Sequence, residues 1–268
     1  MRKSILMILY FYLLGGSVAY AENYYLQAVK STEISVEKLQ KSRDKVKKHK
    51  DIKVQDELEI PPFHKRDEWE KDSLSLTFCT GCHLSPPHTK NLRARAFLNM
   101  HTEFIACETC HLRPENVKFK YQWLDYRSKQ VVKPSTELFR QSINMDDIPK
   151  EAEEKTRKTD VMIKISPFYN NEIALILRDH DFAQKSLDIW KDGEFEDKVN
   201  QRAKIHAPLK EKGPECGDCH QTEDPLLDLK ALGANKMQTR TMQRHIVPQF
   251  FKRYTEDDQK IKIDSLLK

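Results

Sequence analysis

The chain has 268 residues, of which 38% are hydrophobic and 32% are charged, and its formal net charge is +5. This length corresponds to one or two domains, and the apolar fraction is low for a protein that buries a large core of side chains. Because the basic excess is small and evenly mixed with acidic residues, the composition argues against nucleic-acid binding.

Residues 1–21 have the pattern of an export signal. Arg2 and Lys3 precede the apolar run "SILMILYFYLLGGSVAYA", whose end, Ala19–Ala21, fits an A-x-A cleavage site. An uncleaved anchor is the alternative, but the run is short and Gly15-Gly16 interrupts it. We therefore expect cleavage after Ala21, a soluble periplasmic protein and no stable membrane insertion after cleavage. Loss of two basic residues would lower the formal charge from +5 to +3.

Residues 22–72 form a charged N-terminal segment, for which the sequence predicts a surface helix or an extended lead-in. Ser31 or Thr32 can serve as the N-cap of this helix. The cluster Lys45–Lys50 fits a solvated face better than a docking patch for an acidic partner. Pro61-Pro62 marks a break before the next segment. The sparse apolar positions of the expected helix are Ile34, Val36, Leu39 and Val46.

Residues 73–115 hold two copies of Cys-x-x-Cys-His, and a third copy lies in the C-terminal segment 205–268. The copies are Cys79/Cys82/His83, Cys107/Cys110/His111 and Cys216/Cys219/His220. Together they use all 6 cysteines of the chain. In an exported protein, cysteines commonly form disulfides, but a disulfide framework does not require histidine at a fixed offset three times.

Residues 116–204 contain no cysteine and are expected to form a haem-free insertion with strands and a helix. Apolar residues alternate in "VKFKYQWLDY" and in "DVMIKIS", which predicts two half-buried strands. The run "NEIALILRDHDFAQKSLDIW" predicts a helix, and the charged stretch Asp146–Asp160 predicts a loop.

Segment 205–268 is expected to be helical after the third motif. Asp224 can cap a helix with Pro225 in its first turn, four leucines on one face and Gly233 at its end. Two further helices are expected in "NKMQTRTMQRHIVPQFF" and "TEDDQKIKIDSLLK", with a break at Pro248. The expected fold is therefore mainly α with a small β-containing insertion.

The Cys-x-x-Cys-His pattern is typical of covalent haem c attachment. The two thiols add to the haem vinyl groups, and the adjacent imidazole binds the iron from one side. A thioredoxin-like redox site uses a single such motif on an α/β frame. A structural zinc site pairs Cys-x-x-Cys units, and three units cannot pair evenly. The sequence therefore predicts three covalently bound haems c.

The chain resembles the periplasmic multihaem cytochromes c of the cytochrome c7 type. The resemblance covers Phe78–Pro114 and Ile205–Gln221. It implies a haem-packed architecture with much irregular structure, and haems ligated by two histidines that relay electrons. It also implies that His83, His111 and His220 are the proximal iron ligands. Arg93 and Arg95 could pair with haem propionates or be solvated.

The second axial ligand of each iron determines its chemistry, because two imidazoles give a low-potential electron carrier and an open position admits a substrate. His88, His101 and His206 are the predicted distal ligands. The distance in sequence favours an exchange in which His101 serves the first haem and His88 the second. The reserve and weaker alternatives are His180 and His245, His49 and His64, and the methionines Met100 and Met237.

These features predict an electron carrier rather than an enzyme. The expected partners are other redox proteins: cytochromes, a quinol dehydrogenase or a terminal reductase. One alternative is a multihaem redox enzyme with one open iron that acts on a small nitrogen or oxygen species. The other is a haem-bearing subunit of a larger redox complex.

Overall fold

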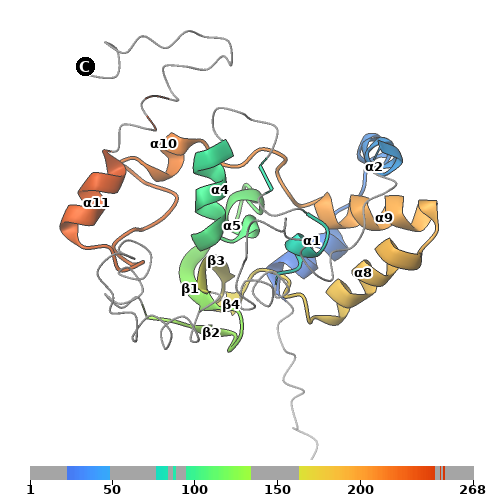
Figure 1. The fold of residues 1–268 in the computed structure, drawn as a ribbon, viewed down its shortest axis with the longest axis horizontal. Helices are drawn as coiled ribbons and strands as arrows, with labels where there is room; N and C mark the ends of the chain where they lie inside the picture. Colours follow the sequence, from blue (N-terminus) through green and yellow to red (C-terminus); the bar gives the residue numbers. More distant parts are fainter. Residues whose placement is uncertain are drawn as a thin grey trace, which may run out of the picture.

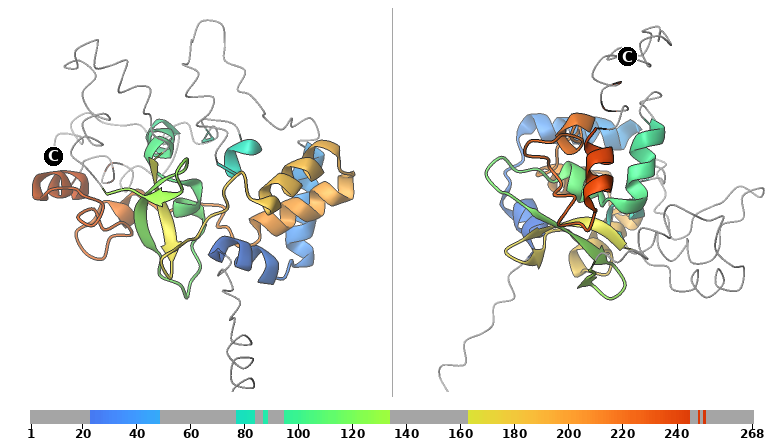
Figure 2. Two further views of the ribbon diagram at one scale, coloured as in Figure 1. Left: turned by 90° about the horizontal axis from the view of Figure 1, so that it is seen from below. Right: turned by 90° about the vertical axis from the view of Figure 1, so that its left-hand side faces the viewer.

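The computed structural model describes residues 23–48, 77–83, 87–88, 95–133, 163–244, 248 and 250. Figure 1 shows a small central sheet, with helices α1, α2, α8 and α9 on one side and α10 and α11 on the other, and the left view of Figure 2 shows the same grouping. None of the helices in these residues has the length and apolarity needed to cross a membrane. The helices are α1 (Tyr24–Ser31), α2 (Val36–Lys48), the 3-10 turn η1 (Cys79–Gly81), α4 (Arg95–Phe104), α5 (Cys107–His111), α8 (Asp181–Asp192), α9 (Phe195–His206), α10 (Cys216–Cys219) and α11 (Lys236–Gln243).

Several predictions concern residues outside the described ranges. These are the export signal, the loop Asp146–Asp160, the last helix and Arg93. The same holds for the alternative ligands His49, His64 and His245.

Helix α1 enters the core, which the prediction of a surface helix or lead-in had missed. Tyr25, Leu26 and Val29 are buried and pack with Phe78 and Leu112 in one hydrophobic cluster. The first helix ends at Ser31, so the N-cap of α2 is provided by Ser35, whose hydroxyl accepts from the Lys38 amide at 3.2 Å. The N-terminal segment therefore stabilises the region around the first two motifs.

Replacing Tyr25 with phenylalanine tests this contact. The Tyr25 hydroxyl donates to the Ile205 carbonyl at 3.0 Å, and the ring is 0% exposed. Because the ring stays and one buried hydrogen bond is lost, we expect the free energy of unfolding to fall by about 1 kcal/mol. Denaturant titration measures this change. The control is Tyr24→Phe, which keeps the edge-on ring contacts with Phe119 and Tyr169 and should change little. Equal losses in both variants would contradict the assignment.

Helix α9 packs against α1, α2 and α8. The buried hydroxyl of Ser42 on α2 donates to the Val199 carbonyl on α9 at 2.9 Å. Arg43 and Glu196 form a two-pronged ion pair at the edge of the same interface. The turn between α8 and α9 requires Gly193, because an added Cβ would lie 2.4 Å from the Ile189 carbonyl oxygen.

The sheet is antiparallel with the order β2-β1-β3-β4. Its strands are β1 (Lys120–Asp125), β2 (Gln130–Val131), β3 (Ile163–Tyr169) and β4 (Glu172–Ile173). The two long strands coincide with the alternating runs in the sequence, and Trp123 pairs with Ile165 across them. Neighbouring residues of β1 are buried on opposite faces: Trp123 packs with Leu227 and Leu232, and Leu124 packs with Ala106 and Phe168. Both faces of the sheet are therefore covered at this point.

The helix predicted from Asn171 begins only at Asp181. Asn170 and Asn171 have φ values of 50° and 64°, which gives a two-residue hairpin loop between β3 and β4. The apolar residues that follow are buried without forming a helix, and they are Ala174, Leu175 and Ile176. An apolar run bounded by an Asn-Asn turn suits a strand as well as a helix, and the hairpin pairing decides between them.

The helix predicted between Asp224 and Gly233 is absent, and these described residues form successive turns. Turns allow Leu227 and Leu232 to bury beside Trp123, and they leave the Leu232 carbonyl free to accept from the Trp123 indole at 2.8 Å. The next predicted helix is present as α11. Its N-cap Asn235 and Gln238 form a reciprocal capping box.

Candidate functional site

The three Cys-x-x-Cys-His motifs adopt similar local structure, a single helical turn. The amides of His83 and His220 each donate to the carbonyl of the first cysteine, Cys79 and Cys216, at 3.0 Å. The second motif is the short helix α5. On a helical turn, positions i, i+3 and i+4 lie on one face. The two thiols and the imidazole of each motif therefore project to the same side.

The first and second motifs meet in the interior. The Cys79 thiol donates to the Glu108 carboxylate at 3.3 Å, and Glu108 belongs to the second motif. A hydrogen bond between the Cys79 and Cys107 thiols raises the pKa of Cys79 and lowers that of Cys107. The sheet supports this junction, because the Ile165 carbonyl accepts from the Ala106 amide at 3.0 Å and from the Thr109 hydroxyl at 2.8 Å. The segment predicted as a haem-free insertion is therefore the platform for the second motif.

The third motif approaches the other end of the second. A Cβ added at Gly213 would lie 3.7 Å from the Cys110 Cβ, so the chain leading to the third motif packs over α5. The Cys110 thiol is close enough to the Cys219 thiol to raise the pKa of Cys219 electrostatically. In contrast to α5, helix α10 has no buried residue. The second motif therefore lies between the other two and is the most deeply placed.

Three of the thiols, those of Cys82, Cys110 and Cys219, do not have the character of reactive cysteines. Burial raises the pKa of Cys82 and Cys110 to about 11 and that of Cys219 to about 12. A redox-active Cys-x-x-Cys site depends on a thiolate that exists near neutral pH. All six cysteines are free and partly exposed, so none forms a disulfide.

Five predicted ligand histidines share one hydrogen-bonding feature. The Nδ1 atom of each faces a carbonyl oxygen, which can only accept, so Nδ1 carries the proton and Nε2 has a free lone pair in the neutral ring. Metal-binding histidines commonly donate their second N–H in this way. The pairs are His88–Asn99 Oδ1 (3.1 Å), His101–Phe97 O (2.6 Å), His111–Lys210 O (2.9 Å), His206–Arg202 O (2.8 Å) and His220–Met242 O (2.6 Å).

Burial keeps two of the predicted distal histidines neutral at pH 7. Desolvation, together with the charge on Arg202, lowers the pKa of His206 to about 4. Desolvation also lowers the pKa of His88. A neutral imidazole is the form that binds iron.

His180 differs from these histidines. Its Nδ1 accepts from the Phe182 amide at 3.1 Å, where it caps α8. The proton of the neutral ring therefore sits on Nε2, which then cannot donate electrons to a metal. Met100 and Met237, the methionine alternatives, are 53% and 79% exposed.

The structure brings four of the histidines together in two pairs. The ring centres of His83 and His206 are 6.0 Å apart with an angle of 62° between the planes. Those of His101 and His220 are 6.1 Å apart with an angle of 90°. His101 therefore lies beside the third motif, whereas the sequence had suggested that it serves the first.

Sequence reasoning missed Glu108, the most buried charged residue of the site. It is 5% exposed, and burial raises its pKa. The buried phenols of Tyr25 and Tyr126 and the amine of Lys164 lie close enough to interact with it electrostatically. No sequence signal identifies it, because the two positions between the cysteines of the motif accept many residue types.

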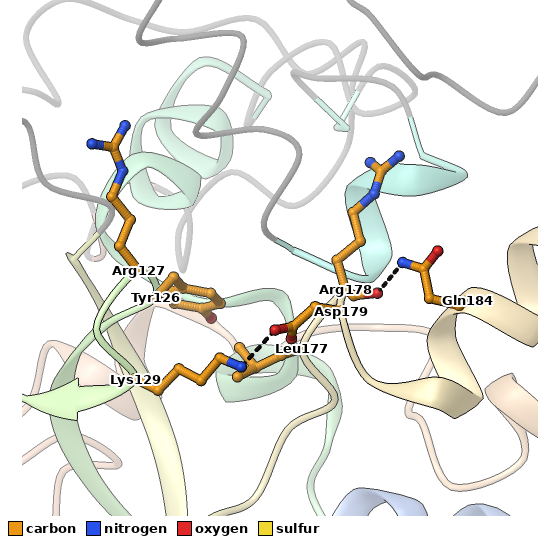
Figure 3. A pocket seen from close by; sticks show the side chains of 7 residues that line it. All are labelled: Tyr126, Arg127, Lys129, Leu177, Arg178, Asp179 and Gln184. Carbon is orange, nitrogen blue, oxygen red and sulfur yellow. Dashed lines mark hydrogen bonds and ion pairs between the residues drawn. The ribbon is translucent and has the colours of Figure 1, made fainter.

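A hollow of about 280 Å³ flanks the first motif. Figure 3 shows Arg127 and Arg178 at its rim and the ion pair between Lys129 and Asp179, 2.5 Å long, in its wall. Arg178 lies beside the first motif, since its Nη1 would be 3.8 Å from a Cβ added at Gly81. The lining contains no cysteine or histidine, so the hollow is distinct from the Cys-x-x-Cys-His turns.

The donor groups at each motif, two thiols and one imidazole, are of the kind that covalent haem c attachment requires. Within the described ranges, no group of three or more His, Cys, Asp or Glu side chains is arranged to hold a metal ion. Each motif instead offers two thiols and one imidazole on one side of a turn, which is the set that a haem uses at its edge and its iron. Comparison with protein-family models, with curated proteins and with solved structures found no match to this chain.

Proposed function

We propose that the chain is an exported triheme c-type cytochrome that transfers single electrons between periplasmic or membrane redox partners. The observation that supports this best is the state of the motif histidines. His111 and His220 each donate Nδ1–H to a backbone carbonyl and so present Nε2 as a ligand on the thiol-bearing turn. A redox iron held by two imidazoles would supply one-electron chemistry at low potential.

The residues of the chain have three tasks in this function. The cysteines attach the cofactor covalently, so that it cannot dissociate on reduction or oxidation. The hydrogen bonds to Lys210 and Met242 fix the orientation of the proximal rings. The bonds from the Ala106 amide and the Thr109 hydroxyl to the Ile165 carbonyl would hold the second attachment point against the sheet after the thiols have reacted.

Intact mass and absorption spectra of the exported protein test this proposal. We expect the mature chain to exceed its polypeptide mass by three haem equivalents, and the reduced protein to show low-spin c-type bands. The matched variant Cys216→Ala/Cys219→Ala should lose one equivalent, because a haem needs its thioethers to remain through denaturation. A mature protein that carries zinc or disulfides at these cysteines instead of haem would end the proposal.

A further inference from the structure

The two imidazole pairs have the separation of ligands on opposite sides of one metal ion. With metal–nitrogen bonds of about 2.0 Å and a ring centre about 1.1 Å behind the coordinating nitrogen, two trans imidazole centres lie about 6.2 Å apart. The observed separations are 6.0 Å for His83 and His206 and 6.1 Å for His101 and His220. Each pair combines one motif histidine with one histidine from another segment.

We propose that His206 is the distal ligand of the haem on Cys79 and Cys82, and that His101 is the distal ligand of the haem on Cys216 and Cys219. This inference rests on the proposed function and assigns ligands within it. It replaces the exchange between the first two haems that sequence distance had favoured. His88 then remains for the second haem, whose motif histidine is His111.

The hydrogen bonds of the distal histidines support this assignment. His101 and His206 each donate Nδ1–H to the carbonyl four residues earlier on their own helices, at 2.6 Å and 2.8 Å. This contact fixes each ring against its helix and leaves Nε2 available. His88 is held by Asn99, whose side chain bonds both its Nδ1 at 3.1 Å and its backbone.

The face of α4 around His101 fits a large flat apolar ligand. Phe97 and Phe104 lie one turn before and after His101 and are 39% and 36% exposed, and Met100 beside them is 53% exposed. Apolar side chains one turn apart occupy one face of a helix. A porphyrin held by His101 and His220 would cover this face and remove its contact with water, which stabilises the assembly.

In this assignment, each of these two haems would join two segments that are distant in sequence. The first would join η1 to the end of α9, and the third would join α4 to the residue after α10. Because a haem can bind both histidines of a pair only when the two segments are folded next to each other, its binding stabilises that folded arrangement.

Alanine variants combined with removal of one haem test the pairing. In the full protein, His206→Ala and His101→Ala should each keep three haems by mass and convert one of them from low to high spin. Added imidazole should restore the low-spin spectrum in both. In the background Cys216→Ala/Cys219→Ala, His206→Ala should still produce one high-spin haem, whereas His101→Ala should produce no further change. His180→Ala is the control and should leave all haems low-spin.

Two results in the Cys216→Ala/Cys219→Ala background would overturn the pairing. One is a high-spin haem after His101→Ala, and the other is no high-spin haem after His206→Ala. The wild-type protein offers a second readout that needs no variant. In the reduced, diamagnetic state, ring protons of His206 should show nuclear Overhauser contacts to the haem bound by Cys79 and Cys82, and those of His101 to the haem bound by Cys216 and Cys219. Contacts to any other haem would refute the assignment. Absence of haem from the purified protein would instead refute the proposed function, so the two failures are distinguishable.

Discussion

Replacing Cys107 and Cys110 with alanine is expected to destabilise the whole protein, whereas the same replacement at Cys216 and Cys219 is expected to be tolerated. The second motif lies in the interior. Glu108 and Thr109 are 5% and 1% exposed, and Leu112 directly after the motif is 1% exposed and packs with α1. Helix α10, by comparison, has no buried residue.

The size of the effect follows from the space that the second haem would leave. An unfilled apolar void costs about 24 cal/mol per Å³, and whole domains are stable by only about 5–15 kcal/mol, so a void of the size of a haem would remove a large part of the stability. We therefore expect the Cys107/Cys110 variant to be degraded or to lose its cooperative thermal transition. The Cys216/Cys219 variant should keep a transition and two haems. Thermal unfolding followed by circular dichroism, together with limited proteolysis, compares the two, and equal melting temperatures would show that the second motif is not central.

Replacing Glu108 with glutamine is expected to stabilise the haem-loaded protein at neutral pH. Burial raises the pKa of this carboxyl group, although the hydrogen bonds from its own amide and from Cys79 and the charge on Lys164 act in the opposite direction. When a haem is attached, the sulfur of Cys79 becomes a thioether and can no longer donate to the carboxylate. An ionised Glu108 would then be buried with one hydrogen-bond donor fewer, which reduces the stability of the folded state by about 1–3 kcal/mol.

The pH dependence has a definite sign. Since the native pKa of Glu108 lies above the unfolded value, the native state binds more protons than the unfolded state between the two values, and wild-type stability falls as pH rises through this window. Below the unfolded pKa, both states are protonated and the penalty is absent. Glu108→Gln should therefore raise the free energy of unfolding only slightly near pH 4 and by about 1–3 kcal/mol at pH 7–8.

Denaturant titrations at several pH values measure this difference. Glu172→Gln is the matched control, because Glu172 is exposed on β4 and its replacement should have little effect at any pH. If Glu108→Gln raised the free energy of unfolding as much at pH 4 as at pH 8, the charge of the carboxylate would not be the cause of the stabilisation.

Features that depend on a few neighbouring residues followed from the sequence alone. The turns η1, α5 and α10 each lie within one motif, so their hydrogen bonds join residues that are close in sequence. The capping box of Asn235 and Gln238 begins α11, and the alternation around Trp123 marks β1. These elements form as expected because their hydrogen bonds and side-chain faces are set within a few residues of the chain.

Only the tertiary structure decided which of these pieces meet. The leucines after the third motif have helical spacing, yet burial against Trp123 and the bond from its indole to the Leu232 carbonyl favour turns. The burial of Glu108 depends on the approach of Cys79 from another segment. The histidine pairs depend on where α9 lies relative to the first motif and α4 relative to the third, so nearness in sequence did not reveal that His101 lies beside His220. A ligand contact between distant segments depends on how whole helices pack, and the local pattern of either segment carries no information about that distance.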